Sequence, residues 1–165
     1  MAREAAVVHT PEYHCDIGVH VFPMEKFGRL RERLVSEGHV AEADILAPAP
    51  ATREELLRVH DGEYLDDLDQ LRWTRRTRSS ELPLTAEIVQ AYRLAAGGTT
   101  LAAREALSRG FGVNLGGGFH HAHADHAEGF CYLNDIAVAI RALQHAGAVR
   151  RAAVVDCDVH QGNGT

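Results

Sequence analysis

Cysteine is scarce in this sequence, and the few cysteines present are not spaced for a structural role. Cys15, Cys131 and Cys157 are the only three among 165 residues. An odd number of widely separated cysteines argues against a disulfide framework. No Cys-x-x-Cys pair occurs, which excludes a cysteine zinc finger. We expect Cys131 and Cys157 to be small buried residues.

Long hydrophobic runs are also missing. No apolar stretch approaches the roughly 20 residues that cross a bilayer, and residues 1–10 have no apolar centre of the kind found in a signal peptide. These two absences predict a cytoplasmic protein with no membrane partner. With 45% hydrophobic and 24% charged residues, the composition is that of a soluble globular protein.

Positive charge is in the minority. The chain has 17 Lys and Arg against 23 Asp and Glu, for a formal net charge of -6. Direct nucleic-acid binding is not expected, because phosphate contacts need clustered basic side chains. One arginine cluster at residues 72–78 surrounds Trp73, but three aspartates between residues 66 and 69 nearly cancel its charge. A solvated loop is therefore favoured over a patch for nucleic acid or an acidic partner.

Hydrophobic periodicity and capping residues predict alternating strands and helices within one domain that spans residues 1–165. The predicted fold class is α/β, with a parallel sheet flanked by helices. Strand, helix and strand between residues 111 and 156 indicate a right-handed crossover in that sheet. Strands are expected at residues 5–9 (an edge or first strand), 45–46, 111–115 and 152–156, and helices at residues 24–37, 52–59, 61–68, 85–108 and 134–146, with a long loop at residues 11–23.

The stretch from Val154 to Thr165 places metal-binding side chains at the end of a predicted strand. Alternate side chains of a strand share one face, so Asp156, Asp158 and His160 should converge. Carboxylate and imidazole ligands suit zinc or a similar divalent ion, but a catalytic zinc normally takes three protein ligands, and only two good candidates are present here. The alternative is a buried strand whose polar end caps a loop, with His160 held only by hydrogen bonds.

A second stretch, residues 116–122, has three glycines followed by Phe119 and the adjacent histidines His120 and His121. Glycines let a ligand or a neighbouring chain come close, and a general base near neutral pH is most often a histidine. Asp156 and Asn163 are candidate partners for the other ring nitrogens. Because both stretches follow parallel strands, whose carboxyl ends lie at one edge of a sheet, they should meet.

Together, the two stretches resemble the zinc-dependent histone deacetylase family, including its bacterial acetylpolyamine amidohydrolase and acetoin-utilisation relatives. The resemblance implies an arginase/deacetylase-like fold and hydrolysis of an N-acetyl amide, in acetyl-lysine or an acetylated polyamine. It extends over the N-terminal part of the family's domain only, so the chain is expected to be truncated, with the C-terminal part absent. The family's third metal ligand and its oxyanion donor belong to that part.

The resemblance also implies roles for individual side chains. Asp158 and His160 would be metal ligands, and the implied metal is Zn²⁺ or another divalent ion. His121 would be the general base, oriented by Asn163. Because some family branches have an aspartate at the position of Asn163, His121 should lack a charged partner and be less basic.

Further roles carried by the resemblance concern the surroundings of the metal. His120 would be the second histidine beside the reacting water, oriented by Asp156. Gly129 and Phe130 would line the narrow channel that receives an acylated lysine or polyamine chain. Backbone oxygens at residues 156–160 would hold a structural K⁺.

Other histidines and aromatics have simpler interpretations. His123 and His126 are spaced like extra ligands, but they lie outside the family's motif and are expected to be exposed, as are His14 and His20. By composition alone, Phe119 and Phe130 are more typical of a core than of a channel.

Competing functions remain at this level. A noncatalytic remnant or partner-binding fragment of a deacetylase is the strongest, and self-association or a complementing second chain fits it. A two-aspartate phosphotransferase would use Asp156 as nucleophile but leaves the paired histidines without a role. A dinucleotide-binding domain is disfavoured because its fingerprint needs a glycine where His121 stands. Ureohydrolases share the fold and use Asp and His ligands, but they lack the glycine and double-histidine stretch.

Overall fold

A computed structural model describes residues 5–165. Its centre is a three-stranded parallel sheet of β1 (Ala6–Val8), β2 (Ile45–Leu46) and β3 (Gly112–Asn114), in the order β2-β1-β3. Val7 of β1 pairs with Ile45 on one side and with Val113 on the other. The first strand of the chain is therefore the central strand of this sheet, and its three residues are all buried.

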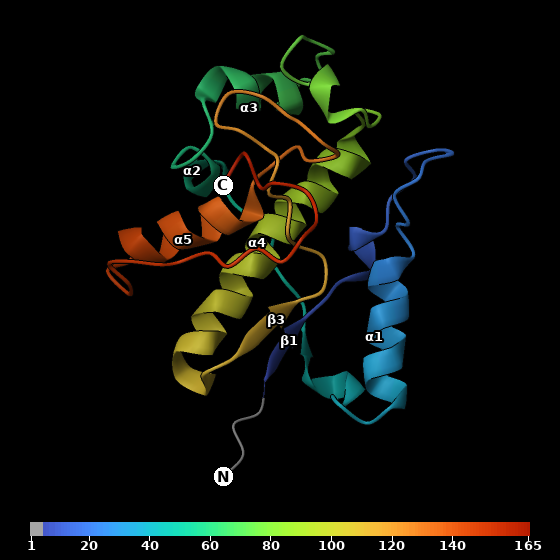
Figure 1. Cartoon of the computed structure of the whole chain (residues 1–165), viewed down its shortest axis with the longest axis vertical. Coiled ribbons are helices and arrows are strands. Elements are labelled where there is room, and N and C mark those ends of the chain that lie inside the picture. The colour runs from blue at the N-terminus through green and yellow to red at the C-terminus, as the bar shows by residue number, and fades with distance from the viewer. Residues whose placement is uncertain (1–4) are drawn as a thin grey trace.

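Residues 5–165 form five helices: α1 (Lys26–Ser36), α2 (Arg53–Leu56), α3 (Gly62–Asp69), α4 (Ala86–Arg109) and α5 (Asp135–His145). Short 3-10 turns lie at Pro11–Tyr13, Glu42–Asp44 and Arg78–Ser80. Figure 1 shows α4 running through the middle of the molecule, with α5 on one side and α1 on the other. Helix α2 is shorter than expected, since it ends at Leu56 and is followed by turns, although Thr52 and Glu55 form a capping box at its start.

Helix α4 packs against β1, β3 and α5. Its two central glycines let it approach two further segments: a Cβ on Gly97 would lie 1.9 Å from the carbonyl oxygen of Ala49, and one on Gly98 would lie 2.2 Å from the hydroxyl of Tyr13. Thr85 caps the start of α4 by accepting a hydrogen bond from the backbone of Ile88, so local signals alone set its N-terminus.

The predicted strand at residues 152–156 is wrong. Among residues 5–165, the segment 150–160 makes no backbone-to-backbone hydrogen bond, and Val155 is 86% exposed. A strand gains its stability from hydrogen bonds to neighbouring strands, and the outer edge of β3 does not pair with this segment. The crossover expected over residues 111–156 is therefore incomplete, and Cys157, expected to be buried, is exposed.

The arginine cluster is a charge-paired loop, as predicted. Arg72 and Arg76 both bind the carboxylate of Asp67, whose side chain is only 4% exposed, and Arg76 also binds Glu63. Among residues 5–165, none of the helices combines the length and the apolar character that a membrane span requires.

Candidate functional site

The glycine and histidine stretch leaves the carboxyl end of β3 and is anchored by a buried carboxylate. Asp135, the first residue of α5, is 1% exposed and accepts hydrogen bonds from the backbone of Phe119 at 2.7 Å and of Gly118 at 3.0 Å, and from the hydroxyl of Thr99. Burial raises the pKa of Asp135, while these hydrogen bonds oppose the rise. Sequence reasoning missed this anchor, because nothing local distinguishes it from an acidic residue in the first turn of a helix.

The C-terminal stretch docks onto that loop. The backbone N–H of Gly164 donates to the carbonyl of His120 at 2.9 Å, and Asn134 donates from Nδ2 to Thr165 Oγ1 at 2.9 Å. A Cβ on Gly164 would lie 2.3 Å from the carbonyl oxygen of Ala122. A glycine is therefore required at position 164 for the two stretches of the chain to lie this close. The predicted meeting of the two stretches is seen here even though residues 152–156 form no strand.

Docking brings each of the paired histidines against a partner. His120 Nδ1 lies 2.6 Å from Asp156 Oδ2, and His121 Nδ1 lies 2.7 Å from Asn163 Oδ1. The two imidazole rings are 4.3 Å apart between centroids. Hydrogen bonds from the backbone of Asp158 and from His120 lower the pKa of Asp156.

A third residue completes the His121 network. Asn163 Nδ2 donates to Glu128 Oε1 at 2.8 Å, and this hydrogen bond lowers the pKa of Glu128. An ionised carboxylate only accepts, so the amide nitrogen of Asn163 must face Glu128 and its oxygen must face His121. His121 Nδ1 is then the protonated nitrogen, which leaves Nε2 with a free lone pair. His121 therefore does have a carboxylate behind it, that of Glu128, with Asn163 between the two. Sequence reasoning missed this role of Glu128.

The two proposed metal ligands lie at the solvent side of the same site. Asp158 Oδ1 is 2.9 Å from His160 Nδ1, and the side chains are 51% and 72% exposed. Hydrogen bonds from the backbone and side chain of His160 lower the pKa of Asp158. The His160 ring is 5.9 Å from the ring of His121, so the ligand pair and the histidine pair are neighbours.

One cavity of about 400 Å³ joins these side chains. Asp156 and Asn163 are not among its lining residues, since they stand behind the histidines that they hold. Phe130 is held in the left-handed region at a φ of 64°, and its backbone N–H donates to the carbonyl of Ser80 at 3.0 Å. Among the residues that line the cavity are the expected His120, His121, Gly129, Phe130, Asp158 and His160, together with Val21, Phe22, Lys26, Glu81 and Phe119.

The loop before α1 and the first residue of that helix supply lining residues that the sequence did not reveal. The ammonium group of Lys26 lies 4.0 Å from the centre of the Phe22 ring, and burial lowers the pKa of Lys26 while Asp158 opposes that shift. Phe22 and His20 in turn pack edge-on against Phe130, at 6.3 and 4.6 Å between ring centroids. His20 is therefore half-buried beside the cavity, whereas His14 is exposed as expected.

The expectation for Cys131 is correct, whereas the expectation for His123 and His126 is wrong. Cys131 is buried as expected, and burial raises the pKa of its thiol to about 12, which makes it unreactive near neutral pH. His123 and His126, expected to be exposed, are half-buried, because their loop folds back on itself through a hydrogen bond from His123 N to His126 O at 3.0 Å.

Comparisons with known proteins agree with this geometry. A family model described as "Histone deacetylase domain" matches residues 20–165. The chain is 36% identical over 153 residues to histone deacetylase 2 of Arabidopsis thaliana, covering 88% of this chain and 40% of that protein. It is 35% identical over 152 residues to a histone deacetylase-like amidohydrolase of Pseudomonas aeruginosa, covering 88% of this chain and 40% of that protein.

A solved structure shows the same fold. The structure described as "crystal structure of an HDAC homolog complexed with SAHA" superposes on this chain with a TM-score of 0.78 and 26% sequence identity. The superposition covers 98% of this chain and 46% of the homolog. The chain thus spans less than half the length of these three proteins. The predicted α/β class with a parallel, helix-flanked sheet of the deacetylase kind is confirmed. On the match over residues 20–165 and the shared fold, the chain belongs to the histone deacetylase family.

Proposed function

We propose that this site serves metal-dependent hydrolysis of an N-acetyl amide, in acetyl-lysine or an acetylated polyamine, with His121 as general base. The observation that carries the proposal is that His121, with Nε2 free, lines the same cavity as Asp158 and His160. A proton acceptor and a pair of metal-binding side chains are the components that hydrolysis by an activated water requires.

The side chains at the cavity fit a divalent cation such as Zn²⁺. Ligand atoms about 2.0 to 2.1 Å from a tetrahedral zinc lie roughly 3.3 Å from each other, and Asp158 Oδ1 and His160 Nδ1 are 2.9 Å apart. Exchanging the hydrogen bond between them for a shared ion therefore needs only a small movement. When bound, the ion would acidify water and polarise the amide carbonyl.

His121 and His120 would divide the proton handling. His121 would accept a proton from the attacking water at Nε2, while its Nδ1–H stays hydrogen-bonded to Asn163 Oδ1. The carboxylate of Glu128, which accepts from Asn163, would stabilise the imidazolium that forms. His120 is 7% exposed, and its Nδ1 lies 2.6 Å from the Asp156 carboxylate, which would hold the ring in place. His120 would therefore be a second, oriented imidazole beside the reacting water.

The aromatic wall suits the aliphatic stem of the substrate. Phe130 and Phe22 lie edge to edge at 6.3 Å, and both line the cavity with Phe119. Acetylation removes the charge of a lysine or polyamine nitrogen, so the modified chain can be buried between apolar rings without the cost of desolvating an ammonium.

A second candidate is a noncatalytic, partner-binding fragment. Two of the side chains that line the cavity, Asp158 and His160, are proposed here as metal ligands, whereas catalytic zinc normally has three. Val155 and Val159 beside them are 86% and 91% exposed, as an apolar surface awaiting a partner would be. We therefore expect a polypeptide of these 165 residues to bind metal weakly and to turn over slowly.

Two measurements on the purified chain separate these functions. Zn²⁺-dependent binding of SAHA, followed by calorimetry, should be lost in Asp158→Asn. Release of acetate from an acetylated lysine peptide should require added Zn²⁺ and should disappear in His121→Ala but persist in His14→Ala, a matched exposed histidine. Zn²⁺-independent SAHA binding would count against the metal site, and no turnover at any Zn²⁺ concentration would favour the noncatalytic fragment.

A further inference from the structure

The loop at residues 123–128, outside the deacetylase cavity, gathers three side chains of metal-binding type. One ligand atom each from His123, His126 and Glu128 lies within 4.8 Å of the others. The two imidazole rings are stacked almost parallel, 4.4 Å apart with 7° between their planes. Glu128 Oε2 faces both rings, at 3.3 Å from His123 Nε2 and 3.6 Å from His126 Nε2.

The hydrogen bonds around this group leave lone pairs facing each other. His126 Nδ1 is 2.6 Å from Asp125 Oδ1, and because that carboxylate only accepts, Nδ1 carries the proton. In the neutral ring, Nε2 then presents a lone pair to the oxygen of Glu128. His123 Nε2 is shielded from solvent and has no hydrogen-bond partner among residues 5–165. The three ligand atoms therefore face one another closely enough to be shared by one cation.

The three atoms are also spaced as ligands of one metal ion. Such an ion, bound between the two nitrogens and the oxygen, would be shared by both stacked rings. The distances of 3.3 and 3.6 Å are close to the roughly 3.3 Å that separates two ligand atoms on tetrahedral zinc.

The surroundings are also those of a metal site. Asp125 holds the far nitrogen of His126, and Asn163 donates to the second oxygen of Glu128 at 2.8 Å. Such outer hydrogen bonds orient ligands and fix the tautomer of a metal-binding histidine. Asn163 also holds His121, so the group lies two hydrogen bonds away from the deacetylase base.

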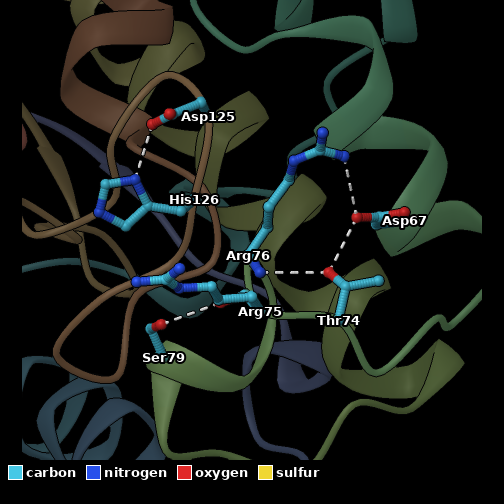
Figure 2. Close-up of a pocket in the computed structure, with 7 residues that line it drawn as sticks. All are labelled: Asp67, Thr74, Arg75, Arg76, Ser79, Asp125 and His126. Atoms are coloured by element: carbon cyan, nitrogen blue, oxygen red, sulfur yellow. Dashed lines mark hydrogen bonds and ion pairs between the residues drawn. The ribbon is translucent and has the colours of Figure 1, made fainter.

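A cavity of about 620 Å³ gives access from solvent. Figure 2 shows His126 and its partner Asp125 on one side of this cavity, with Asp67 and Arg76 on the other. Arg76 does not oppose a cation here, because Asp67 and Glu63 neutralise it.

We propose that His123 Nε2, His126 Nε2 and Glu128 Oε2 form a second divalent-cation site, of the two-histidine, one-carboxylate type that binds Zn²⁺ and leaves a fourth position open. The site is separate from the cavity lined by Asp158 and His160, so the proposal does not depend on the deacetylase function.

The test is Zn²⁺ titration of the chelator-stripped chain against a chromophoric chelator. His126→Ala and His126→Gln should each weaken the tightest Zn²⁺ equivalent by at least about 10-fold. Asp158→Asn, which alters the deacetylase cavity, and His145→Ala, which removes an exposed histidine elsewhere, should leave it within about 2-fold. Zn²⁺ affinity that is insensitive to both His126 variants, or that is lost in Asp158→Asn, would overturn the second site.

A measurement on the unaltered chain avoids any folding defect of the variants. In NMR spectra of the histidine rings, substoichiometric Zn²⁺ should shift the signals of His123 and His126 before those of His160. Signals of His123 and His126 that stay in place through one equivalent of Zn²⁺ would refute the proposal. A shift of His160 alone would instead locate the metal in the deacetylase cavity, and it too would refute the second site.

Discussion

Replacing the buried carboxylate of Asp135 is the sharpest test of how this fold positions its histidines. Asp135 accepts from two consecutive backbone N–H groups, those of Gly118 and Phe119, and from the Thr99 hydroxyl. Asp135→Ala removes all three acceptor contacts. Asp135→Asn keeps the shape, because its carbonyl oxygen can face the backbone and its amide can donate to Thr99.

The magnitude follows from the three hydrogen bonds that an alanine side chain cannot accept. A hydrogen bond to a charged group contributes about 1.5 to 3 kcal/mol. Gly118 is exposed, so water can replace part of its hydrogen bond, and we take the lower end of the range. Asp135→Ala should then lower the free energy of unfolding by about 3 kcal/mol or more, or the melting temperature by roughly 6 to 12 °C for a chain of this size. Asp135→Asn should cost no more than about half of that.

The pH dependence has a definite sign. Burial raises the folded-state pKa of Asp135 above its value in the unfolded chain. Such an acid contributes most to stability below its unfolded pKa of about 3.9, where both states are protonated, and the contribution is lost as pH rises through the folded pKa. The stability of the unaltered chain relative to Asp135→Asn should therefore fall as pH is raised from about 4.

Urea unfolding at several pH values, with the slope of the transition held common, measures both effects. The reasoning would be refuted by an Asp135→Ala chain that unfolds within about 1 kcal/mol of the unaltered one. It would also fail if the stability difference between the unaltered chain and Asp135→Asn grew with rising pH, because the carboxylate would then be stabilised, not penalised, by its surroundings.

Two other outcomes are expected. Gly164→Ala, whose Cβ would lie 2.3 Å from the Ala122 carbonyl oxygen, should lower the free energy of unfolding in urea by about 1 to 3 kcal/mol. As a control, Gly28→Ala places its Cβ in open space and should leave this free energy unchanged or raise it. Equal effects of the two substitutions would contradict the docking of the C-terminal stretch. In acetate-release assays, His121→Ala should slow turnover by about 10² to 10⁴-fold. Glu128→Gln, which keeps an acceptor oxygen in place for Asn163, should slow turnover far less. A larger loss in Glu128→Gln than in His121→Ala would show that His121 is not the base.

The sequence predicted those elements whose signals are local. Helix α4 begins after Thr85 and ends before Gly110 because a side-chain cap and a left-handed glycine act within one turn of the helix. The anchor Asp135 and the partner Glu128 could not be predicted, because their contacts lie 16 and 35 residues away in the chain. The half-burial of His123 and His126 was missed although the hydrogen bond that folds their loop, from His123 N to His126 O, is local.

The aspartate and histidine stretch shows how part of a predicted arrangement can follow from a wrong premise, since Asp158 and His160 line one cavity while Asp156 stands behind His120. Asp156, Asp158 and His160 were expected to converge because alternate side chains of a strand share a face, but no strand forms there. Instead, Asp156 accepts from the backbone of Asp158 at 3.0 Å, and Asp158 accepts from the backbone of His160 at 2.8 Å. Each carboxylate closes a turn two residues on, which is a local preference of aspartate. These turns hold Asp158 and His160, the proposed metal ligands, beside the paired histidines without any help from a sheet, so their placement depends on the aspartates themselves.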